Sequence, residues 1–475
     1  MRQPIFIVVF LLIAMKVALW VSLGPSAIVG DAHGYWNLTS LVVDGDVMMM
    51  GEPIAFRTPI YPWFLAVLRS VSSLFTSPLL GIVVCQALLS IAAVYLACEL
   101  AVKISRRNSA RTWTALAMLP TVSALTYNGF LVTEVFFVFM LMLNLHCVIA
   151  YSEKNSRQRA VLSAGLVGLT LGLTLLTRPV VLLLWIPHLF FVLAKHFTSP
   201  NADEVTLKHR CGHAMLAAAV VVTLCVPWMV RNQRLFGEMF LTEFLGRNIW
   251  IVTFQDGSGA GLSMPESKSA NEIKQRIIRI TGVDWQDTNW RHTWTVSKHL
   301  KESGLSDPAA DRLMKTVAVE AMKTDIAIVS FKAVRRIVNF WRCPASNLPV
   351  SDPAYQGFTP YPKTWSTENQ AVKQITGLAF RFRVSQSVAA NTIVMILIGA
   401  ACFVLIWRRE TRVAGLWIVS ILAYFSVITG IVEIPDYRYR MVVEPLCATA
   451  VGSAMSLLWT LQRNEPSEST SDLAA

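Results

Sequence analysis

Residues 132–151 read VTEVFFVFMLMLNLHCVIAY, an apolar segment with few polar side chains. An α-helix needs about 20 such residues to cross the hydrocarbon core of a bilayer. Apolar segments of similar length recur along most of the chain. The segment therefore predicts one membrane helix among several, and an all-α, multi-pass membrane protein.

The composition is typical of a protein that is surrounded mainly by lipid. Of the 475 residues, 54% are hydrophobic and 15% charged, whereas soluble domains carry about 25% charged residues. The net charge of +12 does not indicate a nucleic-acid partner, because Lys and Arg are spread over short loops and are not interleaved with aromatic residues. The eight cysteines show no CxxC spacing, so we predict no disulfide framework.

About ten membrane helices are predicted. The N-terminal one is interpreted as a retained signal anchor, because its apolar run exceeds the roughly 7 to 15 residues of a cleaved signal peptide. The ten lie near 5–23, 79–102, 112–128, 132–151, 160–177, 179–195, 211–230, 389–407, 414–432 and 441–461.

The loop charges predict which face is which. With a cytoplasmic N-terminus, the cytoplasmic segments are 103–111, 152–159, 195–210, 407–412 and the tail from 462. Each contains Lys or Arg, as the positive-inside rule requires. The loop 24–78 and the long segment 231–388 then face the opposite, outer side.

This topology predicts four parts of the chain. They are an N-terminal membrane module (1–230) with the outer loop 24–78, an α-rich outer insertion (231–388), C-terminal membrane helices (389–461) and a disordered cytoplasmic tail (462–475). Residues 57–73 predict an interfacial or re-entrant helix. Residues 325–341 predict an amphipathic helix, which lies either on the bilayer surface or inside the outer insertion.

Ionisable residues gather on the outer side, where the topology does not call for them. Asp31 follows the first helix, and a partly shielded carboxylate there is a candidate proton acceptor or an ordinary helix-flanking acid. Arg57 is a candidate phosphate ligand or a contact to anionic lipid. Glu134 and Arg178 stand at outer helix ends, where charges are costly unless partnered.

Two further groups lie on the same side. Arg231 and Asn232 follow the seventh helix, where snorkelling explains the arginine equally well. The loop 433–440 contains Arg438, Tyr439 and Arg440 and indicates either anion recognition or an internal ion-pair cluster. Because all these groups fall on one face, we predict a shared site.

The order of these motifs is similar to that of a known superfamily. The chain reads DAHGY (31–35), RTPIYP (57–62), TE (133–134), LTRP (176–179), PWMVRN (227–232) and RYR (438–440). It resembles the GT-C glycosyltransferases over roughly 1–250 and 390–460. The branch it resembles most contains the dolichyl-phosphate-mannose protein mannosyltransferases and the bacterial lipid A aminoarabinose transferase.

The resemblance implies an outward-facing site in which Asp31 is the catalytic base and Arg57 contacts the carrier phosphate. Ala32 stands where many members have a second acid, and this departure argues against a metal-binding role for the loop. We expect Arg438 or Arg440 to share the phosphate. The residues expected to position substrate are Tyr35, Tyr61, Glu134, Arg178, Arg231, Asn232 and Tyr439.

The predicted function is a membrane glycosyltransferase that moves a sugar from a polyprenyl-phosphate donor to an acceptor hydroxyl, with inversion. The acceptor is a lipid, a glycan or a protein, no cofactor is assigned, and a divalent cation is left open. The alternatives are a lipid-linked sugar transporter or flippase and a surface-glycan ligase. The expected location is a bacterial inner membrane, with the site facing the periplasm.

Overall fold

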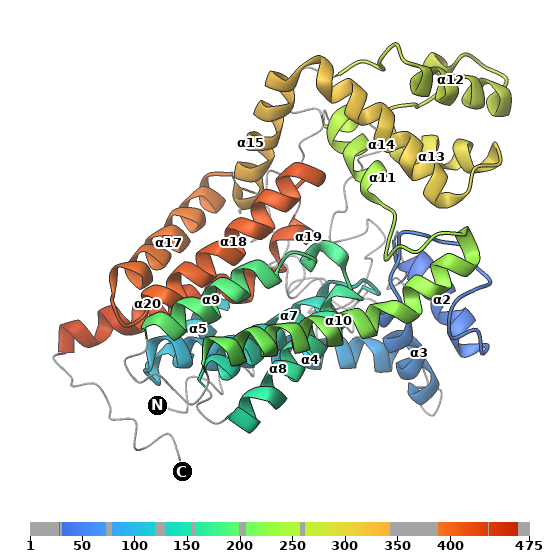
Figure 1. Cartoon of the computed structure of the whole chain (residues 1–475). Helices are drawn as coiled ribbons and strands as arrows, with labels where there is room; N and C mark the ends of the chain where they lie inside the picture. Colours follow the sequence, from blue (N-terminus) through green and yellow to red (C-terminus); the bar gives the residue numbers. More distant parts are fainter. Residues whose placement is uncertain are drawn as a thin grey trace, which may run out of the picture.

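The structure is a computed structural model that describes residues 28, 31–72, 78–118, 130–153, 157–198, 206–256, 262–342, 388–435 and 437–463 (Figure 1). The expected helix at 5–23, the second half of the one at 112–128 and most of the expected tail lie outside these residues. The regular elements of the described residues are all helical, which confirms the predicted all-α class.

The helices are, in chain order, α2 (Asp31–Val43), α3 (Ile60–Ser72), α4 (Pro78–Ser105), α5 (Ser109–Met118), α7 (Glu134–Ser152), α8 (Arg157–Leu175), η3 (Pro179–Val181), α9 (Trp185–Thr198), α10 (Leu207–Phe236), α11 (Leu245–Trp250), η4 (Ile251–Gln255), α12 (Lys268–Thr281), η5 (Trp285–Asp287), α13 (Thr293–Glu302), α14 (Asp307–Thr324), α15 (Ile326–Arg342), α17 (Val388–Trp407), α18 (Arg412–Val432), α19 (Tyr437–Arg440) and α20 (Glu444–Arg463).

Six described segments are long and apolar enough to cross a membrane. They lie in α4, α7, α8, η3 with α9, α10 and α18. Shorter apolar helices occur in α3 and α17. Large apolar side chains on the outer surfaces of α10 and α17, such as Met215, Val222 and Ile396, are exposed, which suits contact with lipid rather than water.

Small residues bring α8 and α10 close together. Gly168 and Gly172 lie one turn apart on α8, and a Cβ added to Gly168 would come within 2.5 Å of the Ala217 carbonyl oxygen. A Cβ at Gly172 would meet Leu224 at 2.6 Å. Such a pair of small residues is typical of tightly packed membrane helices.

A buried polar network joins four apolar helices, α7, α8, α9 and α18. Asn144 of α7 donates to the Thr170 hydroxyl of α8 at 3.0 Å, and its side-chain oxygen lies 2.8 Å from His188 Nε2 of α9. Trp417 Nε1 of α18 donates to His188 Nδ1 at 3.3 Å. Each group has a partner, so the network fixes the relative positions of these helices without leaving a polar group unpaired.

Residues 179–195, predicted as one continuous helix, are divided between the 3₁₀ turn η3 and α9. Tyr424 of α18 stabilises the interruption, since its hydroxyl donates to the Val180 carbonyl and accepts from the Leu183 N–H. A break in a membrane helix is tolerated where a neighbouring side chain satisfies the freed backbone groups.

α10 continues past residue 230, where the outer insertion was predicted to begin, and ends at Phe236. Gly237 follows with φ +79°, a left-handed conformation that commonly ends helices. Arg231 and Asn232 therefore lie inside a helix and not in a loop. The separate helices of the insertion begin with α11.

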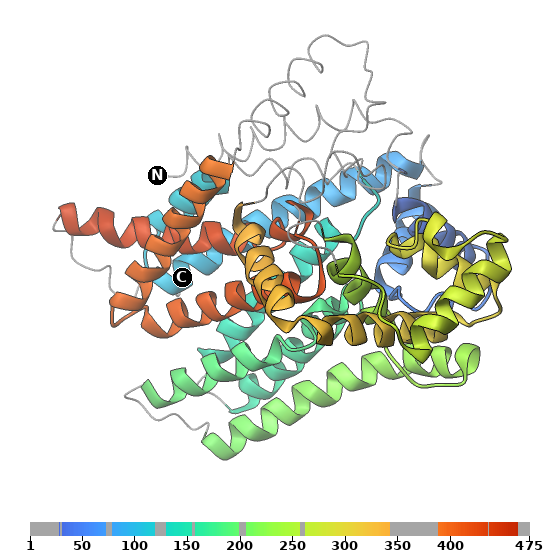
Figure 2. The ribbon, with the colours of Figure 1, turned by 90° about the horizontal axis from the view of Figure 1, so that it is seen from above.

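α11 to α14 form a small helical unit near α2 and α3 (Figure 2). Its core contains Ile273, Leu300 and Met314. A buried arginine, Arg247, binds Asp307 and Asp311, with the Nη2–Oδ1 distance to Asp307 at 2.6 Å. The other oxygen of Asp307 accepts the Ala55 N–H at 2.8 Å. The unit is thereby attached to the first outer loop.

α15 presents apolar residues outward and buries three polar residues, Lys332, Arg336 and Asn339. Phe331 and Val334 are each 59% exposed, whereas Lys332 and Arg336 are buried. Arg336 pairs with Asp256 and donates to the Gly430 carbonyl at the end of α18. The predicted amphipathic character is present, and the exposed stripe fits the bilayer-surface alternative better than packing inside the insertion.

Candidate active site

Asp31 opens α2, where a carboxylate is favoured by the helix dipole. Its Oδ2 lies 2.7 Å from Arg438 Nη1, and its Oδ1 lies 3.8 Å from Arg57 Nη2. Burial works to raise the pKa of Asp31, but Arg438 and then Arg57 outweigh it, so the pKa lies below its usual value. The side chain is still 39% exposed, so a substrate can reach it.

Glu134 opens α7 and has no exposed side-chain surface. Its Oε1 accepts from Arg178 Nη1 at 2.9 Å and also binds Arg438. Its Oε2 has no hydrogen-bond partner among the described residues. A carboxylate this deeply buried needs such partners to stay ionised, so we expect Glu134 to hold the two arginines in place.

Arg438 connects the two acids. It belongs to the single turn α19, and its guanidinium binds Asp31 and Glu134 together. Burial acts to lower the pKa of Arg438, but Glu134 and Asp31 raise it well above its ordinary value. A planar guanidinium can serve two carboxylates at once, and here it joins the first outer loop to the start of α7.

Arg57 lies against α2. Its Cζ is 4.0 Å from the centroid of the Tyr35 ring, and a Cβ added to Gly34 would lie 2.6 Å from its Nη2. Only a residue without a side chain leaves room for the guanidinium here. The Nε of Arg57 is buried without a hydrogen-bond partner in the described part of the chain, and 11% of the side-chain surface is exposed.

The segment that contains Arg57 contacts two other parts of the chain, the end of α8 and α4. Thr58 donates to the Thr177 carbonyl at 3.0 Å, next to Arg178. Tyr61 packs edge-on against Tyr35 with ring centroids 5.1 Å apart, and its hydroxyl donates to Gln86 of α4 at 2.8 Å. The arginine is thus held by elements from three parts of the sequence.

Arg178 reaches the site because it occupies the short connection between α8 and η3. Its Cζ lies 5.9 Å from the ring of Tyr439. Eight residues predicted for the site therefore form one connected group, which we call the carboxylate–arginine cluster: Asp31, Tyr35, Arg57, Tyr61, Glu134, Arg178, Arg438 and Tyr439.

Three other predicted residues have different contacts. Arg231 donates to four carbonyls of the first outer loop, those of Met48, Met49, Glu52 and Ile54. Asn232 accepts from Arg231 and donates to the Phe240 carbonyl. Arg440 binds Asn391, Glu444 and the Trp341 carbonyl. These contacts fix backbone segments and helix ends.

Glu433 was not singled out from the sequence, although its loop was. It follows α18, and its Oε1 accepts the Ile434 N–H at 3.1 Å. Its carboxylate also accepts from Tyr439. Burial raises the pKa of Glu433 to about 7, against smaller opposing effects of Ile434, Tyr439 and the nearby arginines. Glu433 differs from an ordinary loop acid because the loop is partly buried, and the sequence does not show that burial.

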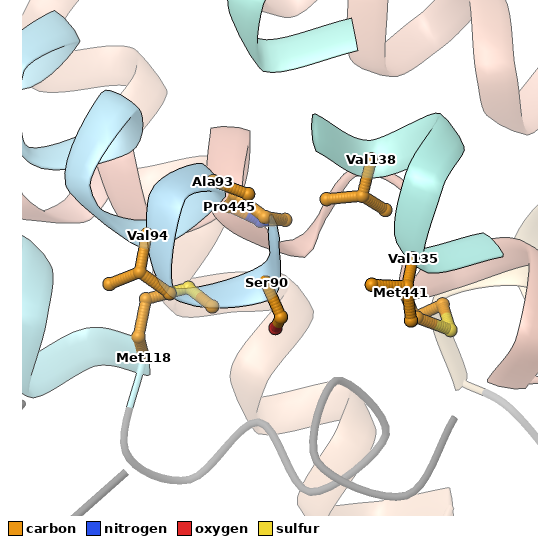
Figure 3. A pocket seen from close by; sticks show the side chains of 8 residues that line it. All are labelled: Ser90, Ala93, Val94, Met118, Val135, Val138, Met441 and Pro445. Carbon is orange, nitrogen blue, oxygen red and sulfur yellow. The ribbon is translucent and has the colours of Figure 1, made fainter. Parts of the chain in front are cut away.

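Figure 3 shows a small apolar pocket between α4, α5, α7 and the start of α20. Its lining includes Val135, Val138, Met441 and Pro445, and Ser90 supplies a hydroxyl. Val135 and Met441 follow closely on Glu134 and Arg438 in the chain. The pocket has no charged side chain in its lining, so it is not itself the reactive centre.

No group of three His, Cys, Asp or Glu side chains that could hold a metal ion occurs within the described ranges.

Residues 62–237 match the family model described as dolichyl-phosphate-mannose-protein mannosyltransferase. The matched part contains Glu134 and Arg178. The match covers less than half of the 475-residue chain. Over these residues the chain is similar to that family, in agreement with the resemblance that the order of the motifs indicated.

Two solved structures of ArnT from Cupriavidus metallidurans are similar to this chain. The one bound to undecaprenyl phosphate has 15% sequence identity and a TM-score of 0.38, and covers 95% of this chain and 78% of that one. The apo structure has 13% identity and a TM-score of 0.36, and covers 94% and 77%. Curated protein sequences gave no significant match.

Proposed function

We propose that this protein is a glycosyltransferase of the GT-C superfamily. It moves a sugar from a polyprenyl-phosphate donor to an acceptor hydroxyl at the carboxylate–arginine cluster, in one displacement that inverts the anomeric carbon. The observation that carries the proposal is the charge of the cluster. Arg57, Arg178 and Arg438 face Asp31 and Glu134. Among the described residues these are three positive and two negative side chains, which leaves one positive charge for a ligand.

A polyprenyl-phosphate sugar complements that charge. It is a phosphodiester with a charge of about −1, whereas the phosphomonoester released by transfer approaches −2 at neutral pH. When Asp31 takes the proton of the acceptor hydroxyl, the cluster gains one positive charge. The growing charge of the leaving phosphate is therefore matched at each stage, which is how preorganised electrostatics lowers a barrier.

The bond changes are few. The hydroxyl oxygen of the acceptor forms a bond to the anomeric carbon while its proton moves to Asp31. The bond from that carbon to the phosphate oxygen breaks, and its electron pair stays on the phosphate. Because a phosphate is already a good leaving group, the site needs no second carboxylic acid of the kind that glycoside hydrolases use to protonate the departing oxygen.

Exposure separates the roles of the two acids. Asp31 is 39% exposed and Glu134 is completely buried between two arginines. An acceptor must come within hydrogen-bond distance of the base, which Asp31 allows and Glu134 does not. We therefore assign proton removal to Asp31 and positioning of Arg178 and Arg438 to Glu134.

The two ends of α7 support the proposed orientation of the cluster. Glu134 is the first residue of α7. Glu153, just past its other end, pairs at 3.2 Å with Lys103, in the last turn of α4 and next to the basic residues Arg106 and Arg107. Since basic loops face the cytoplasm, the cluster faces outward. We propose a bacterial inner membrane, an active site on the periplasmic side and an acceptor hydroxyl of a lipid, glycan or protein.

The proposed donor class is tested with purified protein in lipid nanodiscs and a panel of radiolabelled polyprenyl-phosphate hexoses and pentoses. We expect turnover of at least one donor in the presence of a membrane-extract acceptor. We expect Arg57→Ala to raise the KM for that donor about 10- to 100-fold, because the variant loses one or two charge-assisted hydrogen bonds to the phosphate. Turnover of nucleotide sugars, but of no polyprenyl donor, would overturn the proposal.

Gly34→Ala tests whether the placement of Arg57 matters. The added Cβ would displace the guanidinium, whose Nη2 lies 2.6 Å from its position, but the flexible arginine can move without unfolding the loop. We expect kcat/KM to fall about 10- to 100-fold, since misplacement by an ångström has effects of this size. Gly165→Ala, where an added Cβ meets nothing within 4 Å, is the matched control. Equal rates for both variants would contradict the role of Arg57.

A further inference from the structure

Glu433 differs from the two acids of the cluster in how it is paired. Asp31 and Glu134 each bind two arginines. Within the described ranges Glu433 has no ion pair, and it accepts hydrogen bonds from the Ile434 N–H and from Tyr439. Protonation costs less free energy for a partly buried carboxylate that is bound by neutral donors than for a carboxylate that is paired with arginines.

Its neighbours connect it to the cluster. Tyr439 contacts the carboxylate of Glu433 and lies with its ring 5.9 Å from Arg178 Cζ. Arg438 and Arg178 are the cluster cations that act on Glu433 electrostatically. Glu433 also acts electrostatically on Arg336 of α15, but Arg336 is already paired with Asp256.

We propose that Glu433 is a positioning residue of the donor site, whose protonation adjusts the net charge that Arg178 and Arg438 present to the donor phosphate. This inference rests on the proposed function. With Glu433 neutral, the cluster keeps its net charge of +1 and attracts a phosphodiester. With Glu433 ionised, the net charge becomes zero and the attraction is lost.

The direction of the pH dependence follows. The pKa of Glu433 is raised to about 7 by burial, so the side chain ionises as the pH passes through neutrality. If the donor binds only the neutral form, its Kd rises with pH, and the rise between pH 6 and pH 8 is up to about tenfold. Asp31 and Arg438 do not produce this effect, because their pKa values are displaced away from neutrality.

The test measures binding of undecaprenyl methyl phosphate to the full-length protein in nanodiscs from pH 5.5 to 8.5. This phosphodiester has a fixed charge and carries no sugar, so neither its own ionisation nor the identity of the sugar affects the result. We expect the wild-type Kd to rise five- to tenfold between pH 6 and pH 8. Glu433→Gln should bind as tightly as wild type at pH 6 and lose the dependence.

Two further variants separate charge from structure. Tyr439→Phe keeps the ring but removes the hydrogen bond that lowers the pKa of Glu433, so the loss of affinity should move to higher pH. Glu410→Gln removes an exposed acid beyond the far end of α17 and should leave the profile unchanged. A merely structural role of Glu433 would lower affinity at every pH and would not shift the midpoint.

The outcomes distinguish the inference from the function on which it rests. If wild type binds the diester and Glu433→Gln keeps the same pH dependence, the role of Glu433 is wrong and the donor site stands. If wild type binds no phosphodiester at any pH, although it is folded and monodisperse, the donor site itself is wrong and the inference is lost with it.

Discussion

Asp31→Asn is expected to slow sugar transfer about 10²- to 10⁴-fold, the usual contribution of a general base. The substitution keeps the shape of the side chain but removes the proton acceptor that faces the acceptor hydroxyl. Donor binding should be unchanged or tighter, because Arg438 and Arg57 no longer share their charge with Asp31. Single-turnover rates and donor Kd values, measured separately, test both parts.

Asp44→Asn is the matched control, since Asp44 is an exposed acid just past the end of the same helix, α2. It should transfer sugar at the wild-type rate. If Asp31→Asn keeps a rate within threefold of wild type, Asp31 is not the base. Glu134 would then have to become accessible during the reaction, contrary to its complete burial here.

The sequence was sufficient to predict most membrane helices, because a long apolar run in a bilayer has few alternatives to a helix. The described α4, α7, α8, α17, α18 and α20 lie close to the predicted segments. The division of residues 179–195 was not predictable, since it depends on Tyr424, which lies far along the chain. The extension of α10 beyond residue 230 was not predicted, because residues 231–234 are polar, although Gly237 is a typical residue to end a helix.

The sequence was sufficient to predict which residues lie on one face of the membrane. It was not sufficient to predict which arginine binds which acid. Asp31 and Arg438 are 407 positions apart, and no local pattern joins them. Arg231 and Arg440 look like Arg178 and Arg438 in the sequence, since each is an arginine at an outer helix end. Only the fold shows that Arg231 binds backbone carbonyls.

Arg438→Ala is expected to damage both activity and stability, because one guanidinium serves two acids. Without it, Asp31 keeps only Arg57, at 3.8 Å, and the buried Glu134 keeps only Arg178. Removing one partner of a buried ion pair typically costs about 3–5 kcal/mol of unfolding free energy. The net charge of the cluster falls to zero, so we expect kcat/KM to fall about 10²- to 10³-fold, as when an oxyanion ligand is lost.

Thermal unfolding in detergent and donor kinetics at a temperature where the variant stays folded separate the two effects. Arg438→Lys restores the charge but not the fork that reaches both acids, so it should recover more stability than activity. Arg409→Ala, an exposed arginine in the connection between α17 and α18, controls for the loss of a positive charge. If Arg438→Ala is unstable but transfers sugar at nearly the wild-type kcat/KM, Arg438 only supports the fold, and the phosphate must bind elsewhere.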